Sequence, residues 1–532
     1  MEKKLTHSKW FLYLTEFFAG MSVMAVELGA SRLMAPYFSS SQIVWTVIIG
    51  VIMIAMAVGN IWGGRMADKS KSPDRLYGRV IIAAIWIALI PFAGRWMIAG
   101  ISFLLATFVT KNFLVWAALA ACLVIFAFPC VLLGTVTPSL TKFTVDNLDD
   151  TGRTVGQLNA LNTIGSIIGT FVPTFITIPA VGTAVTFLIF AGILLVICLA
   201  YFASVRRQGK RCLAAVVLMA LCAAGGAGSR FAFWEKDLLY EGESIYNYLQ
   251  VRETPESVIL STNVLFGVQS VHMKEAGLTG MYYDYALAAP LLAGIMEAEK
   301  ASVLILGLGS GTYASQCSRY FPQAQVTGVE IDEQIVQLAH DYFELPSSVE
   351  TAVYDGRAYL AASSERYDVI MVDAYQDITI PFQMSTVEFF DQVRDHLTEN
   401  GVMVVNMNMH SDSEGAINQY LADTISTMFP SVYTAEVPGT TNRVLFAAAE
   451  GDLAGRLRQA LPAVQDEALA GLMVQAAERL TPYQSSGRLL TDDRAPVELL
   501  GMRAIDELIA GELTYYRGIL EREGVSGLIQ AM

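Results

Sequence analysis

The sequence predicts a multi-pass α-helical membrane domain followed by a doubly wound α/β domain, with a small β region between them. Of its 532 residues, 54% are hydrophobic and only 16% are charged, whereas about a quarter are charged in ordinary soluble domains. Residues 1–230 carry 18 Lys and Arg against 8 Asp and Glu, which leaves 17 against 42 for the rest of the chain. This asymmetry predicts a domain boundary near residue 230, and the acidic second part argues against a nucleic-acid partner.

Seven apolar stretches of the first part have the length of membrane-crossing helices, which need about 20 residues each. They lie near residues 10–34, 42–64, 77–94, 113–135, 156–179, 183–203 and 212–228. The stretch 97–110 is apolar but short, and Arg95 and Lys111 flank it, so we expect it to lie in the interface or to re-enter. The pattern predicts a multi-pass protein of the cell membrane, with lipid as its partner.

Two basic clusters indicate which ends of these stretches face the cytoplasm. GGRMADKSKSPDR follows the second stretch and RRQGKR follows the sixth, and basic loops are retained on the inner side. Within the first cluster, Gly63, Gly64, Arg65, Asp68 and Lys69 resemble the loop motif of major facilitator transporters. The six cysteines show no metal-type spacing, so we expect neither a disulfide framework nor a metal site.

From residue 301 onward, apolar runs alternate with amphipathic segments, which is typical of a parallel sheet with helical crossovers. The runs at 303–309, 325–332, 350–360, 367–375 and 401–408 are the predicted strands. A further helix and two closing strands are expected within 411–449, and an amphipathic helix within 451–480. We divide the second part into a small β/α region (231–295), a nucleotide-binding domain (296–450) and a C-terminal helical region (451–532).

Glycines and acidic residues follow these strands at the edge where doubly wound sheets bind ligands. Gly307, Gly309 and Gly311 let the backbone approach a ligand without a Cβ clash. Glu330 comes about 20 residues later, at the spacing typical of a carboxylate that binds ribose hydroxyls.

Two further carboxylates occupy corresponding positions. Asp355 ends the third strand, where it would accept a hydrogen bond from an adenine amino group, and Gly356 follows it. Asp373 ends the fourth strand, above the middle of the expected pocket. The glycine pattern alone fits a nicotinamide dinucleotide fold equally well. The ordered set of glycine loop, Glu330-Ile331-Asp332, Asp355-Gly356 and Asp373 is much more specific.

With these motifs, residues 240–450 resemble spermidine synthase, and the membrane part resembles the N-terminal region of its membrane-fused relatives. ESIYNYLQV (243–251), FGVQSV (266–271) with Gln269, and YYDYALAAPLL (282–292) are similar to the small domain of the family. DITIPFQMSTVEFF resembles the gate segment and its following helix. The resemblance implies a class I methyltransferase-like Rossmann domain that releases methylthioadenosine after aminopropyl transfer to an amine. It also implies a homodimer as the expected assembly.

The resemblance implies a role for each matching residue. Asp373 would be the general base. Binding of S-adenosylmethionine or its decarboxylated form is expected from Gly307, Gly309, Ser310, Gly311, Glu330, Ile331, Asp355, Gly356, Gln269 and Asn247. Binding of the amine is expected from Tyr246, Tyr283, Asp284, Tyr375 and Asp377.

The sequence departs from the family pattern at several of these positions. Ser310 replaces an aspartate that holds the aminopropyl ammonium group, Asp284 replaces a His or Gln, and Asn247 replaces a Gln. Asp377 lies four residues after Asp373 rather than three, and no proline follows it. Because Ser310 removes a negative charge, we expect the site to tolerate the carboxylate of intact S-adenosylmethionine.

These departures leave two alternative functions open. One is a lyase or cyclase that cleaves S-adenosylmethionine without an amine, or a methyltransferase. The other is a polyamine or nucleoside transporter with the α/β domain as its sensor. An S-adenosyl donor predicts a cytoplasmic α/β domain, whereas seven crossings from a cytoplasmic N-terminus would place that domain outside.

Overall fold

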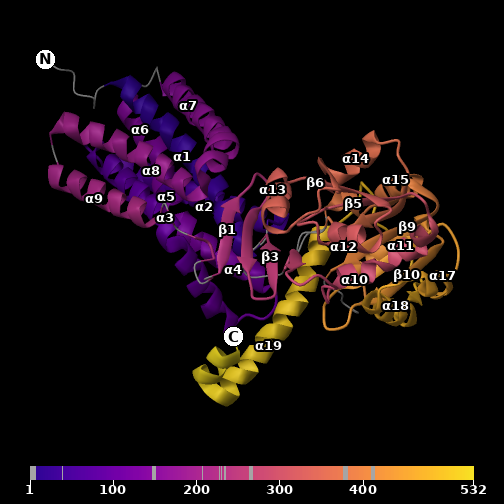
Figure 1. The fold of residues 1–532 in the computed structure, drawn as a ribbon. Helices are drawn as coiled ribbons and strands as arrows, with labels where there is room; N and C mark the ends of the chain where they lie inside the picture. The colour runs from indigo at the N-terminus through magenta and orange to yellow at the C-terminus, as the bar shows by residue number, and fades with distance from the viewer. Residues whose placement is uncertain are drawn as a thin grey trace. The chain divides into compact units, whose positions relative to one another are not determined.

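The protein is described by a computed structural model that covers residues 8–38, 40–145, 151–206, 208–226, 228, 230–232, 235, 237–262, 268–374, 381–408 and 414–531. The chain forms two compact units (Figure 1). Unit 1 comprises Met1–Glu235 with Glu512–Met532, and unit 2 comprises Lys236–Gly511. The finer boundaries expected near residues 295 and 450 stay predictions.

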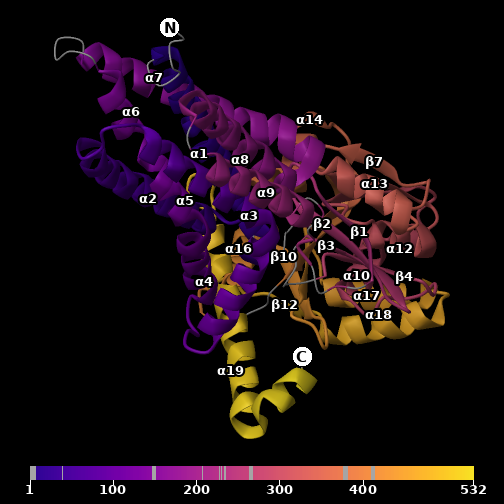
Figure 2. The ribbon, with the colours of Figure 1, turned by 90° about the vertical axis from the view of Figure 1, so that its left-hand side faces the viewer.

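Unit 1 is built from long apolar helices (Figure 2). In chain order they are α1 (Lys9–Phe38), α2 (Gln42–Asp68), α3 (Asp74–Ala106), α4 (Phe113–Cys122), η2 (Leu123–Ala127), α5 (Phe128–Gly134), α6 (Val136–Thr144), α7 (Thr151–Val172), η4 (Pro173–Thr177), α8 (Ile178–Val205) and α9 (Gly209–Gly226). The last helix of the chain, α19 (Val497–Ala531), begins in unit 2, and its residues from Glu512 onward belong to unit 1.

Six helical segments among the described residues are long and apolar enough to cross a membrane. One of them, Thr151–Val205, is 55 residues long and contains both of the stretches expected at 156–179 and 183–203. The backbone of Gly182 leaves helical geometry there (φ 78°, ψ 168°), which separates the two arms. Residues 97–106 continue α3 as one helix, so the expectation of a re-entrant segment is wrong, and an interfacial position for them stays a prediction. Arg95 is accommodated because its guanidinium donates to the Arg230 carbonyl at 2.6 Å.

Glycines bring α1 and α7 into close contact inside unit 1. A Cβ atom on Gly165 would lie 2.0 Å from the Phe17 carbonyl oxygen, and one on Gly169 would lie 2.1 Å from that of Met21. Small residues at a helix interface permit this approach in apolar surroundings. The fully buried Glu16 also joins these helices, because Asn162 Nδ2 donates to its Oε1 at 2.8 Å.

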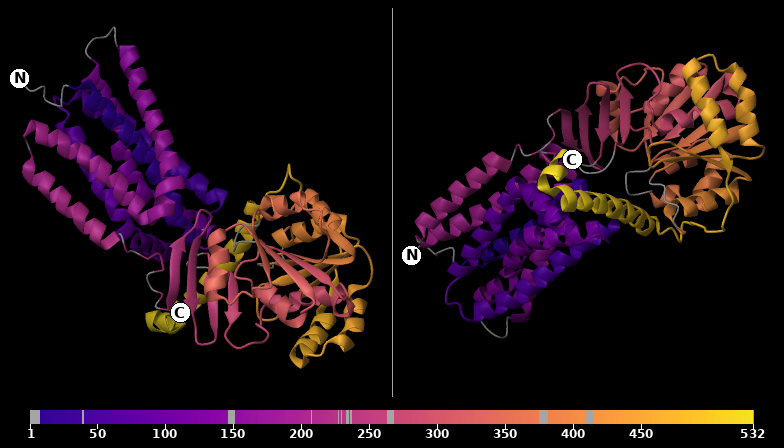
Figure 3. Two further views of the ribbon diagram at one scale, coloured as in Figure 1. Left: turned by 45° about the horizontal axis from the view of Figure 1, so that its top comes forward. Right: turned by 90° about the horizontal axis from the view of Figure 1, so that it is seen from below.

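Unit 2 begins with a small antiparallel sheet of four strands in the order β1-β2-β3-β4 (Figure 3). These are β1 (Leu238–Glu243), β2 (Tyr248–Glu253), β3 (Ser257–Ser261) and β4 (Ser270–Met273). Alternate residues of β2 and β3, including Leu249, Val251 and Leu260, pack on Ile335 and Leu338 of helix α13 (Glu333–Tyr342). The expected small β region is therefore a sheet with one covered face.

The large sheet has eight strands in the order β12-β10-β11-β9-β8-β5-β6-β7. Its strands are β5 (Ala301–Leu306), β6 (Ala324–Glu330), β7 (Glu350–Val353), β8 (Tyr367–Val372), β9 (Leu397–Met407), β10 (Ser431–Glu436), β11 (Arg443–Ala448) and β12 (Thr481–Pro482). The first five of these pair in parallel, whereas β11, β10 and β12 add antiparallel strands at one edge. All five predicted parallel strands and both closing strands are present, so the doubly wound fold is confirmed.

Helices cover both faces of the large sheet. One face packs against α10 (Tyr282–Ala286), α11 (Ala288–Leu292), α12 (Thr312–Tyr320), α17 (Leu453–Ala460) and α18 (Glu467–Arg479). The other face packs against α14 (Gly356–Ala362), α15 (Val387–Asp395) and α16 (Ile417–Met428). Neighbouring residues of one strand point to opposite cores: Ile305 contributes to the first and Leu306 to the second. Both faces are buried, which explains the continuous apolar runs in the sequence.

The strand order reverses at β5, which pairs with β6 on one side and with β8 on the other. After β5 the chain forms β6 on one side of β5, and it later crosses over to form β8 on the other side. The loops that leave the carboxyl ends of β5 and β8 consequently separate here and leave room for a ligand. This switch point is where Gly307 and Asp373 follow their strands.

Candidate active site

The loop after β5 adopts a backbone that only glycine accommodates without strain. Gly307, Gly309 and Gly311 have φ angles of 92°, 57° and 83°. A Cβ atom on Gly307 would lie 2.6 Å from the Asp373 carbonyl oxygen and from backbone atoms of Ala374. The loop after β5 and the end of β8 are thus in direct backbone contact.

Glu330 ends β6 and holds the glycine loop in place. Its Oε2 accepts a hydrogen bond from the Gly309 amide at 2.9 Å, and its Oε1 accepts one from the Asp332 amide at 3.2 Å. Burial raises the pKa of this carboxyl, while these amide donors lower it. A carboxylate oxygen accepts more than one hydrogen bond, so the arrangement leaves capacity for a pair of ribose hydroxyls.

Asp355 caps helix α14, with its Oδ1 accepting from the Ala358 amide at 2.9 Å. A Cβ atom on the next residue, Gly356, would lie 3.1 Å from Met384 Cε. Met384 belongs to the short helix η6 (Phe382–Met384), which belongs to the segment between β8 and α15. These two elements form adjacent walls of one pocket.

Asp373 is a buried carboxyl group of the pocket that accepts two side-chain hydrogen bonds. Its Oδ2 accepts a hydrogen bond from the Tyr282 hydroxyl at 2.6 Å, and its Oδ1 accepts one from Asn406 Nδ2 at 3.1 Å. Burial raises the pKa of Asp373 to about 7, although both donors lower it, and the nearby Glu330 adds to the increase. A carboxyl with this pKa exchanges a proton readily near neutral pH.

A second amide fixes the orientation of Asn406. Asn442 Nδ2 donates to Asn406 Oδ1 at 2.9 Å, which leaves the Asn406 amino group to face Asp373. Asn442 itself lies between β10 and β11. The antiparallel edge of the sheet therefore contributes to the position of Asp373.

Nine predicted site residues line one pocket at the switch point. They are Tyr246, Gln269, Gly307, Gly309, Glu330, Ile331, Asp355, Gly356 and Asp373. The sequence reasoning missed other lining residues, namely Thr262, Ser270, Leu308, Val329, Ile335, Tyr354, Ala374, Pro381, Gln383 and Met384. Gln383 and Met384 lie in the segment that resembles the family's gate, which was the available signal for them.

Other predicted residues lie beside the pocket or are held elsewhere. Ser310 and Gly311 are buried in the glycine loop, and Ser310 Oγ lies 3.2 Å from Thr312 Oγ1. Asn247 donates to Asp332 at 3.1 Å. Tyr283 donates to the Gln269 carbonyl at 3.0 Å.

The carboxylate of Asp284 is occupied by its own loop. Asp284 Oδ1 accepts from the amide and hydroxyl of Thr279, and its Oδ2 accepts from the Gly280 amide at 2.7 Å. The neighbouring Tyr282, which the sequence reasoning passed over, contacts Asp373 instead. Tyr375 and Asp377 lie outside the described residues.

Comparison with known proteins identifies the family to which the chain belongs. The profile of the spermine/spermidine synthase domain matches residues 290–453. A probable polyamine aminopropyl transferase of Bifidobacterium longum is 51% identical over 351 residues, which cover 63% of this chain and 78% of that protein. Polyamine aminopropyltransferases of Vibrio vulnificus (28% identical, 51% of this chain, 94% of the relative) and Aquifex aeolicus (27%, 39% and 74%) also match. The chain belongs to the polyamine aminopropyltransferase family, which includes spermidine synthase.

Proposed function

We propose that this protein transfers an aminopropyl group from an S-adenosylmethionine-derived sulfonium to an amine and releases methylthioadenosine. The observation that carries the proposal is the buried Asp373, held by Tyr282 and Asn406 at the switch point of the sheet. The relatives from Bifidobacterium longum, Vibrio vulnificus and Aquifex aeolicus are all named as aminopropyltransferases. None of these three is named as a lyase, a methyltransferase or a transporter.

In the proposed reaction, Asp373 accepts a proton from the ammonium form of the acceptor. The freed nitrogen lone pair attacks the carbon next to the sulfonium, a C–N bond forms, and the C–S bond breaks with its electron pair on sulfur. The sulfonium becomes a neutral thioether, so no metal ion is needed to stabilise the leaving group. The site mainly aligns the two substrates, excludes water and holds the proton.

The donor side of the pocket lacks the aspartate of the family pattern. Ser310 stands at that position, and its side chain is turned toward the Thr312 hydroxyl inside the protein. We infer that the donor side of the pocket, which lacks the negative charge of that aspartate, accepts decarboxylated S-adenosylmethionine and also tolerates the carboxylate of the intact compound. Ser310→Asp tests this: it should weaken binding of intact S-adenosylmethionine, and unchanged affinity would contradict the inference.

The apolar helices of unit 1 support a membrane location. We propose a multi-pass protein of the cell membrane in which unit 2 works on the cytoplasmic side, where S-adenosyl donors are made. The proposal also includes a polyamine-type acceptor and a homodimer as the assembly.

The test is a product assay on the full chain purified in detergent. Either form of S-adenosylmethionine is supplied with and without putrescine, and the nucleoside products are separated. Methylthioadenosine that requires both the decarboxylated donor and the amine supports the proposal, and Asp373→Asn should then stop turnover while methylthioadenosine still binds. Formation of methylthioadenosine without any amine would instead indicate a lyase or cyclase.

A further inference from the structure

The end of the pocket that carries Asp355, where we expect the adenine to bind, is formed by two walls that are distant in sequence. One wall is the start of α14 with Asp355 and Gly356, and the other is η6 with Gln383 and Met384. The methyl group of Met384 approaches Gly356 so closely that a Cβ atom would lie 3.1 Å from it. The width of the pocket at this end therefore depends on what holds η6 against α14.

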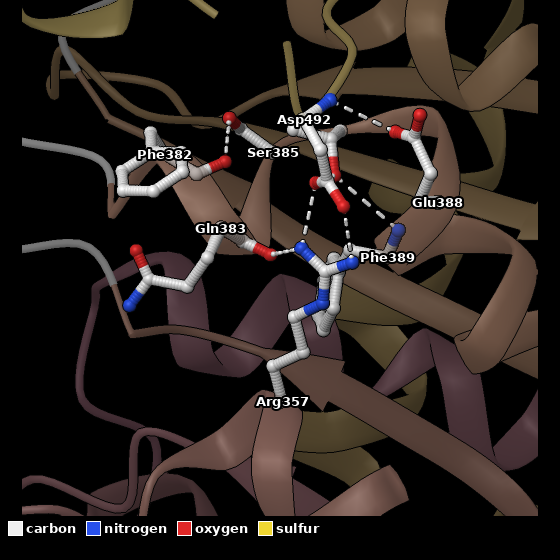
Figure 4. A network of polar contacts seen from close by, with 8 residues as sticks. Arg357, Phe382, Gln383, Ser385, Glu388, Phe389 and Asp492 are labelled. Carbon is white, nitrogen blue, oxygen red and sulfur yellow. Dashed lines mark hydrogen bonds and ion pairs between the residues drawn. The ribbon is translucent and has the colours of Figure 1, made fainter.

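Arg357 spans the gap between the two walls. It follows Gly356 directly, and its Nη1 donates to the Gln383 carbonyl at 3.0 Å (Figure 4). The same guanidinium forms a bidentate pair with Asp492, with both N–O distances at 2.7 Å. Planar pairs of this kind fix geometry as well as charge, and the Arg357 guanidinium lowers the pKa of Asp492.

Asp492 also holds the helix that follows η6. Its Oδ1 accepts from the Thr386 hydroxyl at 2.7 Å, and Thr386 in turn caps α15 by accepting from the Phe389 amide at 3.3 Å. The Asp492 amide donates to Glu388 Oε2 at 3.0 Å (Figure 4). One residue thus contacts both the arginine of the first wall and the start of α15 beyond the second.

The segment that carries Asp492 is anchored independently of the pocket. Leu490 is fully buried in a cluster with Ile417 and Val497, and its amide donates to the Thr424 hydroxyl at 3.0 Å. The Leu490 carbonyl accepts from the Val387 amide at 2.9 Å. This anchored segment follows residue 453, where the match to the synthase domain ends.

We propose that Asp492 is a positioning residue that sets the nucleoside end of the donor pocket through Arg357 and Thr386. It keeps η6 against the start of α14, so that Gln383 and Met384 close on the nucleoside of the donor. The inference rests on the proposed function, because it assigns the adenine end of the same pocket. Its expected signature is weaker binding of donor and nucleoside product, with little change in the chemical step at Asp373.

The experiment compares Asp492→Asn and Arg357→Gln with the wild-type full chain in detergent. Each variant should raise the donor KM and the Kd of methylthioadenosine by about tenfold, while kcat and the amine KM stay within about twofold. The double variant should be no weaker than either single variant, because the two residues act as one unit. Asp492→Glu, which keeps the charge, should recover part of the affinity.

Glu436→Gln is the matched control, since it removes an arginine–carboxylate pair between the exposed Glu436 and Arg443, neither of which lines the pocket. An unchanged Kd for methylthioadenosine in Asp492→Asn would overturn the inference. So would equal losses for donor and amine together with a lower melting temperature, because those losses indicate a general structural role. The binding measurement needs no turnover, so failure of this inference is distinguishable from failure of the proposed reaction.

Discussion

The behaviour of Asp373 is decided by opposing effects on a single carboxyl group. Burial disfavours the charged form, and the hydrogen bonds from Tyr282 and Asn406 favour it. Burial has the larger effect, which gives a pKa of about 7 instead of the ordinary 3.8. A base with this pKa is deprotonated often enough at neutral pH to accept a proton from an ammonium group.

This balance predicts the pH dependence of the reaction. We expect kcat/KM to rise with pH through about 7, because only the deprotonated Asp373 accepts a proton. Tyr282→Phe removes a donor to the carboxylate, so it should raise the pKa of Asp373 and move this rise to higher pH. The acceptor amine also titrates, but its pKa is the same for both enzymes, so the shift reports on Asp373. A Tyr282→Phe profile that coincides with the wild type would contradict the assignment.

Sequence reasoning located the carboxylates of the site but not their hydrogen-bond partners. Glu330, Asp355 and Asp373 could be predicted because each ends a parallel strand, and the carboxyl ends of such strands meet at one edge. The hydrogen bond from Tyr282 to Asp373 joins residues 91 positions apart. That contact depends on how α10 packs against the sheet, which no local pattern specifies.

At the scale of elements, the glycine loop is defined by steric limits. Gly307→Ala should lower the melting temperature and abolish measurable binding of methylthioadenosine. The left-handed backbone alone costs about 1–2 kcal/mol with a Cβ atom, and that atom would also lie 2.6 Å from the backbone of Ala374. Calorimetric titration and thermal melting check both effects.

The matched control for this substitution is Gly471→Ala in α18. Gly471 lies inside a helix, with nothing within 4 Å of an added Cβ atom. Alanine favours a helix over glycine by about 1 kcal/mol, so this variant should melt at a higher temperature and bind methylthioadenosine normally. If both variants melted at a lower temperature, the loss of stability in Gly307→Ala could not be assigned to the geometry of the glycine loop.

The strands could be predicted from continuous apolar runs. The helices were predicted less well, because prolines divide them. The five parallel strands were evident from apolar runs because both faces of the sheet are buried. The helix expected across 451–480 is divided into α17 and α18 with the short helix η7 (Leu461–Ala463) after α17, since Pro462 cannot donate a backbone hydrogen bond. The segment 282–292, which resembles part of the family's small domain, likewise forms two short helices, α10 and α11. Pro290 cannot donate to the Ala286 carbonyl, which accepts from the Tyr313 hydroxyl at 3.1 Å instead.

For the whole molecule, charge and hydropathy separate two units with different physical requirements. Unit 1 exposes large apolar side chains such as Trp96, Phe103 and Phe175, and lipid is the environment that would cover them. Unit 2 carries most of the acidic residues and holds the candidate active site. Membrane anchoring would therefore keep the aminopropyltransferase at a bilayer surface.

The side of the membrane that unit 2 occupies depends on α9. The basic cluster after α8 predicts that the start of α9 lies in the cytoplasm. With 18 residues, α9 is the shortest candidate span, close to the lower limit for crossing. If α9 crosses, unit 2 lies outside, and a donor made in the cytoplasm would not reach Asp373. The donor argument therefore predicts a cytoplasmic unit 2, whereas the packing of α9 along α3, with Gly225 beside Phe92 and Gly226 beside Pro91, favours a crossing.

An inserted epitope tag measures this directly. A tag after Gly439, which has open space around it in the loop between β10 and β11, should be labelled only after the cells are permeabilised. The same tag within residues 70–73 provides the cytoplasmic reference, because this loop lies in the first basic cluster. A tag after Lys111, one helix further along, provides the outer reference. Labelling at Gly439 in intact cells, as at Lys111, would place the active site outside and require that its donor be supplied there.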